Sequence, residues 1–280
     1  MDSMSIIVTG ATGHLGRLIV ESLLRNGTPA GEIVAAGRNT GVLDDLKARG
    51  VRVARIDYDE PSTLDGVTSS GDVVMLVSGS EPGRRVPQHS AVIDAAKTAG
   101  AARIVYTSAT NARNTSLVLA PEHKATEEYL EASGVPFTVL RNNWYNENYE
   151  GTVAQARQTG TVVTSTGDGR VASASRSDYA EAAAVVLASE GHEGKVYELG
   201  GDTAWNFAEL AALLGAAFEN VAPEEHLAIL TGAGLDEGTA GFVVALDGNI
   251  REGVLGTPTG DLSRLIGRPT TTIAEYVATI

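Results

Sequence analysis

The sequence contains no cysteine among its 280 residues. Disulfide bonds, thiolate nucleophiles, iron–sulfur clusters and thiolate zinc sites are thereby excluded. The five histidines are scattered along the chain, and none of them has the spacing of a metal site. We therefore expect no bound metal. The lack of cysteine also fits a cytoplasmic protein, since disulfides are rare in the cytosol.

Long apolar runs and an excess of positive charge are missing as well. No apolar stretch approaches the roughly 20 residues that span a bilayer, and no basic-then-apolar secretory signal opens the chain. Asp and Glu number 35 against 21 Lys and Arg, and the resulting formal charge of −14 repels the phosphate backbone of nucleic acids. We interpret the acidity as a solubility feature and expect neither nucleic acid nor a membrane as a partner. The assembly state stays open between a monomer and a homodimer.

Short apolar runs alternate with helical patterns over residues 1–141. The runs predict six strands: Ser5–Thr9, Glu32–Ala36, Val51–Ile56, Asp72–Val77, Arg103–Thr107 and Pro136–Arg141. We interpret them as continuously apolar, which is typical of parallel strands buried on both faces. Strands that alternate with helices form right-handed βαβ units. The sequence therefore predicts an α/β protein with a Rossmann-like, doubly wound parallel sheet and helices on both faces.

The pattern loosens after Arg141. We predict a helix capped near Ser177 and continuing to Leu187, a strand over Val196–Leu199, a helix over Phe207–Leu214 and a last helix near Thr272–Ile280. We predict that residues 1–141 form the Rossmann core and that segments near 160–190 return to it. Residues 142–280 would mostly form a small lobe, with the chain crossing between the two parts.

The strongest motif is Thr9–Gly16, which reads Thr-Gly-Ala-Thr-Gly-His-Leu-Gly between a predicted strand and a predicted helix. Such a turn presents free N–H groups and the positive end of the helix dipole to a pyrophosphate. Gly10 permits the turn, Gly13 lets the backbone approach the phosphates, and Gly16 lets the helix pack closely on the sheet. The alternative is a merely tight turn. We predict a dinucleotide bound by Gly10, Ala11, Thr12, Gly13, His14 and Leu15.

The end of the second predicted strand selects the dinucleotide. An acidic residue there binds the ribose 2′-hydroxyl of NAD(H), whereas a basic one binds the 2′-phosphate of NADP(H). This chain has Arg38 and Asn39, and the next acid is Asp44. We predict NADP(H) with Arg38 on its 2′-phosphate; the alternative is an Arg38 that only stacks on adenine. The role of Asp57 stays open: it either accepts a hydrogen bond from the adenine or is an ordinary surface residue.

Several segments resemble one family. Thr9–Gly13 resembles the start of NmrA-like, atypical short-chain dehydrogenases/reductases. Four more segments resemble type 2 NAD(P)H:quinone oxidoreductases: Glu81–His89, Arg141–Tyr149, Gly191–Leu199 and Leu265–Thr272. The resemblance covers nearly the whole chain and is weakest over residues 215–250. It implies a cytoplasmic enzyme that prefers NADPH and reduces quinones, with a cofactor domain and a small lobe on the quinone side.

A familiar catalytic pair is missing. Typical short-chain dehydrogenases use Tyr-x-x-x-Lys, in which Lys lowers the pKa of Tyr for proton transfer to a carbonyl. None of the eight tyrosines has Lys four residues later, and His123 stands where that Lys is expected. Carbonyl–alcohol chemistry and sugar epimerisation are therefore disfavoured. Quinone reduction needs no such pair, because a hydride passes directly from nicotinamide to an electron-poor ring without a flavin.

Polar and aromatic residues follow later predicted strands, at the sheet edge where ligands bind in open α/β folds. For the nicotinamide end we predict Ser78, Gly79, Ser80, Asn142 and Arg176 as cofactor ligands. For the quinone we predict a wall made by Asn142, Trp144, Tyr145 and Glu147. Loop capping is the alternative for the serines, and a salt bridge near the following helix for Arg176. The aromatic residues have an alternative as a hinge that packs the lobe onto the core.

The sequence does not single out a catalytic residue. His123 and Tyr145 are the candidates. His123 and Glu127 share a helix face, but we favour a structural role because hydride transfer does not require them. We interpret His89 as a surface or capping residue. Two rival functions remain open, namely an NADP(H)-sensing regulatory protein without turnover, and a reductase of another small enone or carbonyl with His123 as proton donor.

Overall fold

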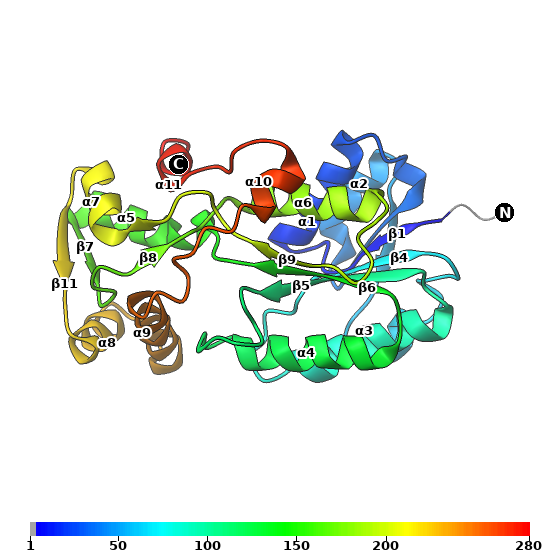
Figure 1. The fold of residues 1–280 in the computed structure, drawn as a ribbon, viewed down its shortest axis with the longest axis horizontal. Coiled ribbons are helices and arrows are strands. Elements are labelled where there is room, and N and C mark those ends of the chain that lie inside the picture. Colours follow the sequence, from blue (N-terminus) through cyan, green and yellow to red (C-terminus); the bar gives the residue numbers. More distant parts are fainter. Residues whose placement is uncertain (1–3) are drawn as a thin grey trace.

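The computed structural model describes residues 4–280. Its centre is a seven-stranded sheet in the order β3-β2-β1-β4-β5-β6-β9, in which every neighbouring pair is parallel (Figure 1). The strands are β1 (Ile6–Val8), β2 (Ile33–Gly37), β3 (Arg52–Arg55), β4 (Val73–Leu76), β5 (Arg103–Ala109), β6 (Phe137–Asn142) and β9 (Val196–Leu199). Each overlaps a predicted strand. The predicted Rossmann-like, doubly wound parallel sheet is confirmed.

Helices cover both faces of this sheet (Figure 1). One face carries α1 (His14–Arg25), α6 (Arg176–Ala188) and α10 (Asp261–Ile266), and the other carries α3 (Arg85–Ala99) and α4 (Ala120–Ser133). Alternate strand residues point to opposite faces, so Val8 packs in the cluster under α1 and α6 while Ile7 packs in the cluster under α3 and α4. The chain order reverses at β1, which lies between β2 and β4. In open α/β sheets such a reversal opens a crevice at the carboxyl ends of the strands.

The prediction of continuously apolar strands is wrong for β3. Arg52 and Arg55 are exposed, and Val53 and Ala54 are only partly buried. The reason is position, because β3 is an edge strand with a neighbour on one side only.

Most of the remaining elements gather beyond the carboxyl ends of these strands (Figure 1). They include a parallel pair, β7 (Thr161–Thr164) with β11 (Ala217–Asn220), and an antiparallel pair, β8 (Arg170–Val171) with β10 (Trp205–Asn206). The helices are α5 (Glu150–Thr159), α7 (Phe207–Leu214), α8 (Pro223–Gly232), α9 (Glu237–Arg251) and α11 (Ile273–Val277). Shorter helices elsewhere are α2 (Asp44–Ala48), η1 (Ala30–Glu32), η2 (Thr40–Leu43), η3 (Pro61–Leu64) and η4 (Asn146–Tyr149). Tyr149, Trp205 and Phe207 form an aromatic group in the separate apolar core of this part.

Two helix boundaries differ from the prediction. The cap of α6 is Ser175, whose side chain accepts from the backbone of Asp178, and it precedes the predicted cap at Ser177. The last helix ends at Val277, earlier than predicted, although Thr272 caps it through a capping box with Glu275. Among residues 4–280, no helix is long and apolar enough to cross a membrane.

Candidate active site

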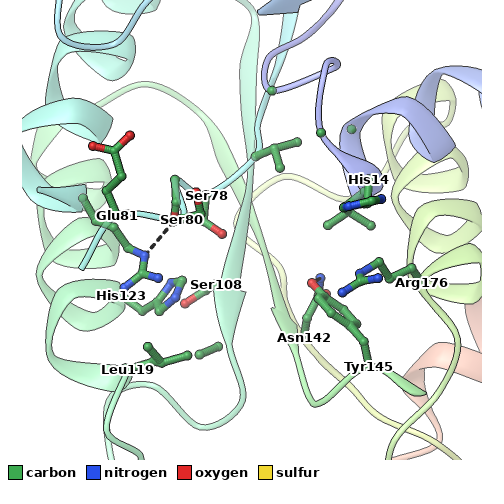
Figure 2. A pocket seen from close by; sticks show the side chains of 18 of the residues that line it. His14, Ser78, Ser80, Glu81, Ser108, Leu119, His123, Asn142, Tyr145 and Arg176 are labelled. Atoms are coloured by element: carbon green, nitrogen blue, oxygen red, sulfur yellow. Dashed lines mark hydrogen bonds between the residues drawn. The ribbon is translucent and has the colours of Figure 1, made fainter. Parts of the chain in front are cut away.

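A cavity of about 560 Å³ opens where the strands of the large sheet end (Figure 2). Its walls come from the segments that follow β1, β2, β3, β4, β5 and β6, together with Arg176 at the start of α6 and Leu255. The lining contains three cationic side chains (Arg38, Arg85 and Arg176) and two acidic ones (Asp57 and Glu81). The cavity is therefore more basic than the chain as a whole, which carries −14. Such a balance favours a ligand with phosphate groups.

The turn after β1 brings the first turn of α1 close to the backbone of Gly10 and leaves the N-terminus of the helix accessible to a ligand. Gly10 has φ of +61°, a conformation that L side chains rarely adopt. A Cβ atom on Gly16 would lie 2.3 Å from the carbonyl oxygen of Gly10, so the first turn of α1 can pack here only without a side chain. Gly13 caps α1 with no side-chain hydrogen bond, which leaves the first backbone N–H groups of the helix for a ligand.

Five of the six predicted turn residues line the cavity, namely Gly10, Thr12, Gly13, His14 and Leu15. Ala11, which was also predicted to bind the dinucleotide, does not line the cavity. It is fully buried, and its N–H donates to the carbonyl of Ala36 at 2.9 Å, so it secures the turn to β2 and is not part of the cavity wall.

Arg38 follows β2 with its side chain 63% exposed and its Nη1 3.2 Å from Oε1 of Glu81. Tyr58 lies nearby and is a site residue that sequence reasoning missed. Its hydroxyl donates to Thr9 at 2.5 Å and lies 3.2 Å from the carbonyl of Val77, which ties the segment after β3 to β1 and β4. Its place after the third strand, next to Asp57, was the signal available in the sequence.

The loop Ser78–Ser80 is held from behind by two side chains of α3. Gly79 donates its N–H to Nε2 of His89 at 2.9 Å, and its carbonyl accepts a hydrogen bond from Nε of Arg85 at 2.7 Å. Arg85 also pairs with Glu122 at 2.9 Å. The interpretation of His89 as a surface residue is wrong, because the ring is fully buried as the acceptor that this loop requires. Burial, with the nearby charges of His123 and Arg85, lowers the pKa of His89 to about 3.

Glu127 does not pair with His123. Its side chain is fully buried and accepts from Ser108 at 2.6 Å, from Arg141 at 2.7 and 2.9 Å, and from Arg113 at 3.0 Å. Burial alone raises the pKa of this carboxyl, but Arg141 and Ser108 outweigh it and hold the pKa below its ordinary value. Glu127 is therefore an ionised anchor beneath Ser108, which lines the cavity.

His123 lines the cavity from α4, beside Ser108 (Figure 2). Its Nδ1 lies 2.7 Å from the hydroxyl of Tyr106, a residue of β5 that is fully buried. Burial, and secondarily the charge of Arg85, lowers the pKa of His123 to about 4. The imidazole is thus neutral at neutral pH.

Two of the three aromatic side chains after β6 line the cavity, namely Trp144 and Tyr145. The Tyr145 hydroxyl accepts from Nδ2 of Asn142 at 3.0 Å, and the Arg176 guanidinium carbon lies 5.1 Å from the ring centroid. Trp144 also packs against the apolar core of the second part. Tyr149 faces that core and is absent from the lining.

Glu147, which was predicted as part of the quinone wall, also lies outside the cavity lining. Both carboxylate oxygens accept from the backbone N–H of Arg176, at 2.9 and 3.0 Å, so Glu147 secures the start of α6 and does not line the cavity. Arg176 itself forms no salt bridge among the described residues; its Nη2 donates to Asn148 at 3.0 Å while the side chain lines the cavity.

Three leucines at the apolar end of the cavity were not predicted. Leu117, Leu119 and Leu255 line this end beside Trp144, which was predicted. Leu117 and Leu119 come from the irregular segment between β5 and α4, and Leu255 comes from the loop after α9. No local pattern marks such residues, because the fold brings them together from distant segments. No group of three or more metal-binding side chains occurs among residues 4–280.

Comparison with known proteins agrees with this arrangement. The family model described as NAD(P)H-binding matches residues 10–190. Quinone oxidoreductase 2 of Escherichia coli (strain K12) is 43% identical over 279 residues, which cover 98% of this chain and 97% of that protein. The crystal structure of that enzyme complexed with NADPH superposes with a TM-score of 0.92 and covers 98% of this chain and 99% of its own.

A second solved structure carries a different acceptor in its name. Triphenylmethane reductase of Citrobacter sp., complexed with NADP(H), is 35% identical, with a TM-score of 0.93 and coverage of 98% of this chain and 99% of its own. The chain thus belongs to the NAD(P)H-binding, NmrA-like family that includes quinone oxidoreductase 2.

Proposed function

We propose that this protein reduces quinones by direct hydride transfer from NADPH, without a flavin. The observation that carries the proposal is the layout of the cavity. A phosphate-binding turn and Arg38 lie along one part of it, and an apolar wall with Trp144 and Leu255 lies at another. A full-length relative at 43% identity is named a quinone oxidoreductase, and its structure holds NADPH.

The residues present fit NADPH. The N-terminus of α1, which has no side-chain cap, offers N–H groups to a pyrophosphate. The cavity is bordered there by Gly10, Thr12, Gly13, His14 and Leu15. Arg38, mostly exposed, offers a guanidinium fork to the 2′-phosphate. The serines of Ser78–Ser80 and the side chains of Asn142 and Arg176 would hold the nicotinamide end.

The chain's own residues then position the two reactants. When bound, NADPH supplies a hydride, and water supplies the proton that completes the hydroquinone. Tyr145, braced by Tyr179 at a ring-centroid distance of 5.1 Å, and Trp144 offer flat surfaces to aromatic rings. Leu117 and Leu119 close the apolar side and exclude water. Holding two flat rings in contact accounts for most of the required rate increase.

We assign the two parts of the chain complementary roles within this proposal. Residues 1–141 with α6 would hold the cofactor, and the lobe would supply the acceptor side through Leu255. We place the enzyme in the cytoplasm, consistent with its lack of cysteine, and retain a homodimer as an expectation for light scattering to test.

The test is a turnover assay on purified protein free of flavin. NADPH oxidation is followed with and without a simple 1,4-quinone, and NADH is run in parallel. Quinone-dependent oxidation with a preference for NADPH supports the proposal. Tight NADPH binding with no oxidation over a panel of quinones would instead indicate a regulatory sensor.

A further inference from the structure

Two buried histidines lie side by side behind the cavity and differ in one respect. His89 uses both ring nitrogens on the protein. Its Nδ1 lies 3.0 Å from the hydroxyl oxygen of Thr126, which gives its own hydrogen to the carbonyl of Glu122 at 2.9 Å. Nδ1 of His89 must therefore donate, and its Nε2 accepts from Gly79 at 2.9 Å. His89 is complete as a structural residue.

His123 has one nitrogen to spare. Its Nδ1 lies 2.7 Å from the hydroxyl of Tyr106, and burial raises the pKa of that Tyr, which keeps its hydrogen. We assign the hydrogen of Tyr106 to the bond with Nδ1, which lies 2.7 Å from this buried hydroxyl, and this assignment puts the proton of the neutral ring on Nε2. Within residues 4–280, Nε2 has no hydrogen-bond partner, and it is not among the fully buried unpaired atoms. The ring lines the cavity, so this N–H is open to a ligand.

The polar neighbour of His123 on its own wall has already committed its hydrogen. Ser108 donates to Glu127 at 2.6 Å and therefore offers only lone pairs to the cavity. On the facing wall, Asn142 donates one of its two amide hydrogens to the hydroxyl oxygen of Tyr145 at 3.0 Å. Figure 2 places His123 beside Ser108 and Leu119, on the wall opposite Asn142 and Tyr145. The proposed function assigns this part of the cavity to the nicotinamide and the acceptor.

We propose that His123 donates a hydrogen bond from Nε2 to the carbonyl oxygen of the acceptor, and that Tyr106 fixes the tautomer that allows it. The inference rests on the proposed quinone reduction. NADPH loses a hydride and becomes NADP⁺, the quinone gains that hydride and becomes a hydroquinone monoanion, and water delivers the final proton. A fixed N–H aimed at the oxygen that gains charge stabilises this step without itself losing a proton.

Three variants test this role. Gln at position 123 keeps an N–H donor at a similar reach, whereas Leu has a similar size and no donor. His123→Leu is expected to lower kcat with a quinone by about 100-fold, the usual order for loss of one such donor, and His123→Gln to restore most of it. Tyr106→Phe keeps His123 but frees its tautomer, so kcat should fall by an intermediate factor. NADPH affinity, measured by fluorescence titration, should change less than about twofold in all three, because binding of the cofactor does not use this N–H.

The outcomes separate the alternatives. Wild-type protein that binds NADPH but reduces no quinone overturns the proposed function itself. Wild-type turnover with His123→Leu equally active overturns only the role of His123. Equal losses in the Leu and Gln variants, matched by equal losses in NADPH affinity and melting temperature, would show a structural residue.

The pH profile of wild-type kcat gives a readout that needs no variant. It should lack an inflection between pH 6 and 8, whereas an inflection near 6.5 that disappears in His123→Gln would show proton transfer in place of hydrogen-bond donation.

Discussion

Arg38 stands at the carboxyl end of β2 with most of its side chain in solvent and Glu81 as its ion-pair partner. Exposed pairs of this kind contribute roughly 0–1 kcal/mol, so Glu81 holds Arg38 only weakly. A 2′-phosphate offers two charges and several acceptor oxygens, and it can displace the carboxylate. We therefore expect a single substitution of Arg38 to separate the two nicotinamide cofactors.

Arg38→Ala is expected to raise the KM for NADPH by about tenfold or more, since a hydrogen bond to a charged group is worth roughly 1.5–3 kcal/mol. The KM for NADH should stay within about twofold, because NADH lacks the phosphate. Arg55→Ala is the matched control, an exposed arginine outside the cavity lining. Equal losses with both cofactors would contradict the assignment of Arg38.

The buried histidines also predict how stability depends on pH. Folding lowers the pKa of His89 to about 3 and that of His123 to about 4, below the ordinary 6.5. The unfolded chain therefore takes up protons first as the pH falls through 6.5, and stability is lost from there toward pH 4. Between pH 7 and pH 5 each histidine should cost on the order of 2 kcal/mol.

Urea unfolding at these two pH values measures the effect. The double variant His89→Gln/His123→Gln should lose less stability on acidification than the wild type. Identical losses in the two proteins would show that other groups determine the acid sensitivity.

Residues predicted at the site share one property, which is a position at a strand end. Gly10, Arg38, Ser78 and Asn142 follow runs that the sequence marks as strands, and the parallel topology brings those ends to one edge. Leu119 and Leu255 come from irregular loops, so no periodic pattern identifies them. The role of His89 depends on the N–H of Gly79, a backbone group that no sequence pattern reveals.

Among the elements, the junction of β1 and α1 leaves no room for a side chain at Gly16. A methyl group on Gly16 would meet the Gly10 carbonyl oxygen at 2.3 Å and the Ala11 Cα at 2.9 Å, and both are backbone atoms. The turn must shift before such a side chain fits, and the N–H groups that face the cofactor shift with it.

Gly16→Ala should weaken NADPH binding by at least about tenfold, by displacing the turn, and should lower the melting temperature as overpacking does. Gly31→Ala serves as the control, because a Cβ atom there meets nothing within 4 Å. Isothermal titration and a thermal melt of both variants check the prediction. A Gly16→Ala protein that binds NADPH normally would contradict the close packing of this turn.

Strand positions were readable from the sequence, whereas edges and helix ends were only partly so. A buried parallel strand can be identified in the sequence from its continuous apolar run. Whether a strand such as β3 lies at an edge depends on the order of strands, which is a tertiary property. The start of α11 is fixed locally by Thr272 and Glu275, but its early end at Val277 is not.

At the scale of the whole molecule, the cavity lies where two apolar cores meet. Tyr145 packs against the core of the sheet, and Trp144 packs against the core of the second part. These two neighbouring residues therefore connect the cavity wall to both cores. The chain as a whole is acidic, but the arginines that line the cavity make it locally basic. This distribution of charge favours a phosphate-bearing cofactor over nucleic acid. Sequence patterning predicted the sheet and its edge, and the resemblance predicted the chemistry.

The function proposed for this protein is direct hydride transfer from NADPH to a quinone without a flavin. Stopped-flow oxidation of NADPH that carries deuterium at the transferred C4 position tests this function. We expect quinone-dependent oxidation that is slowed by the deuterium and is stoichiometric in NADPH. Tight binding of NADPH with no oxidation by any quinone tested, or turnover that appears only after flavin is added, would contradict it.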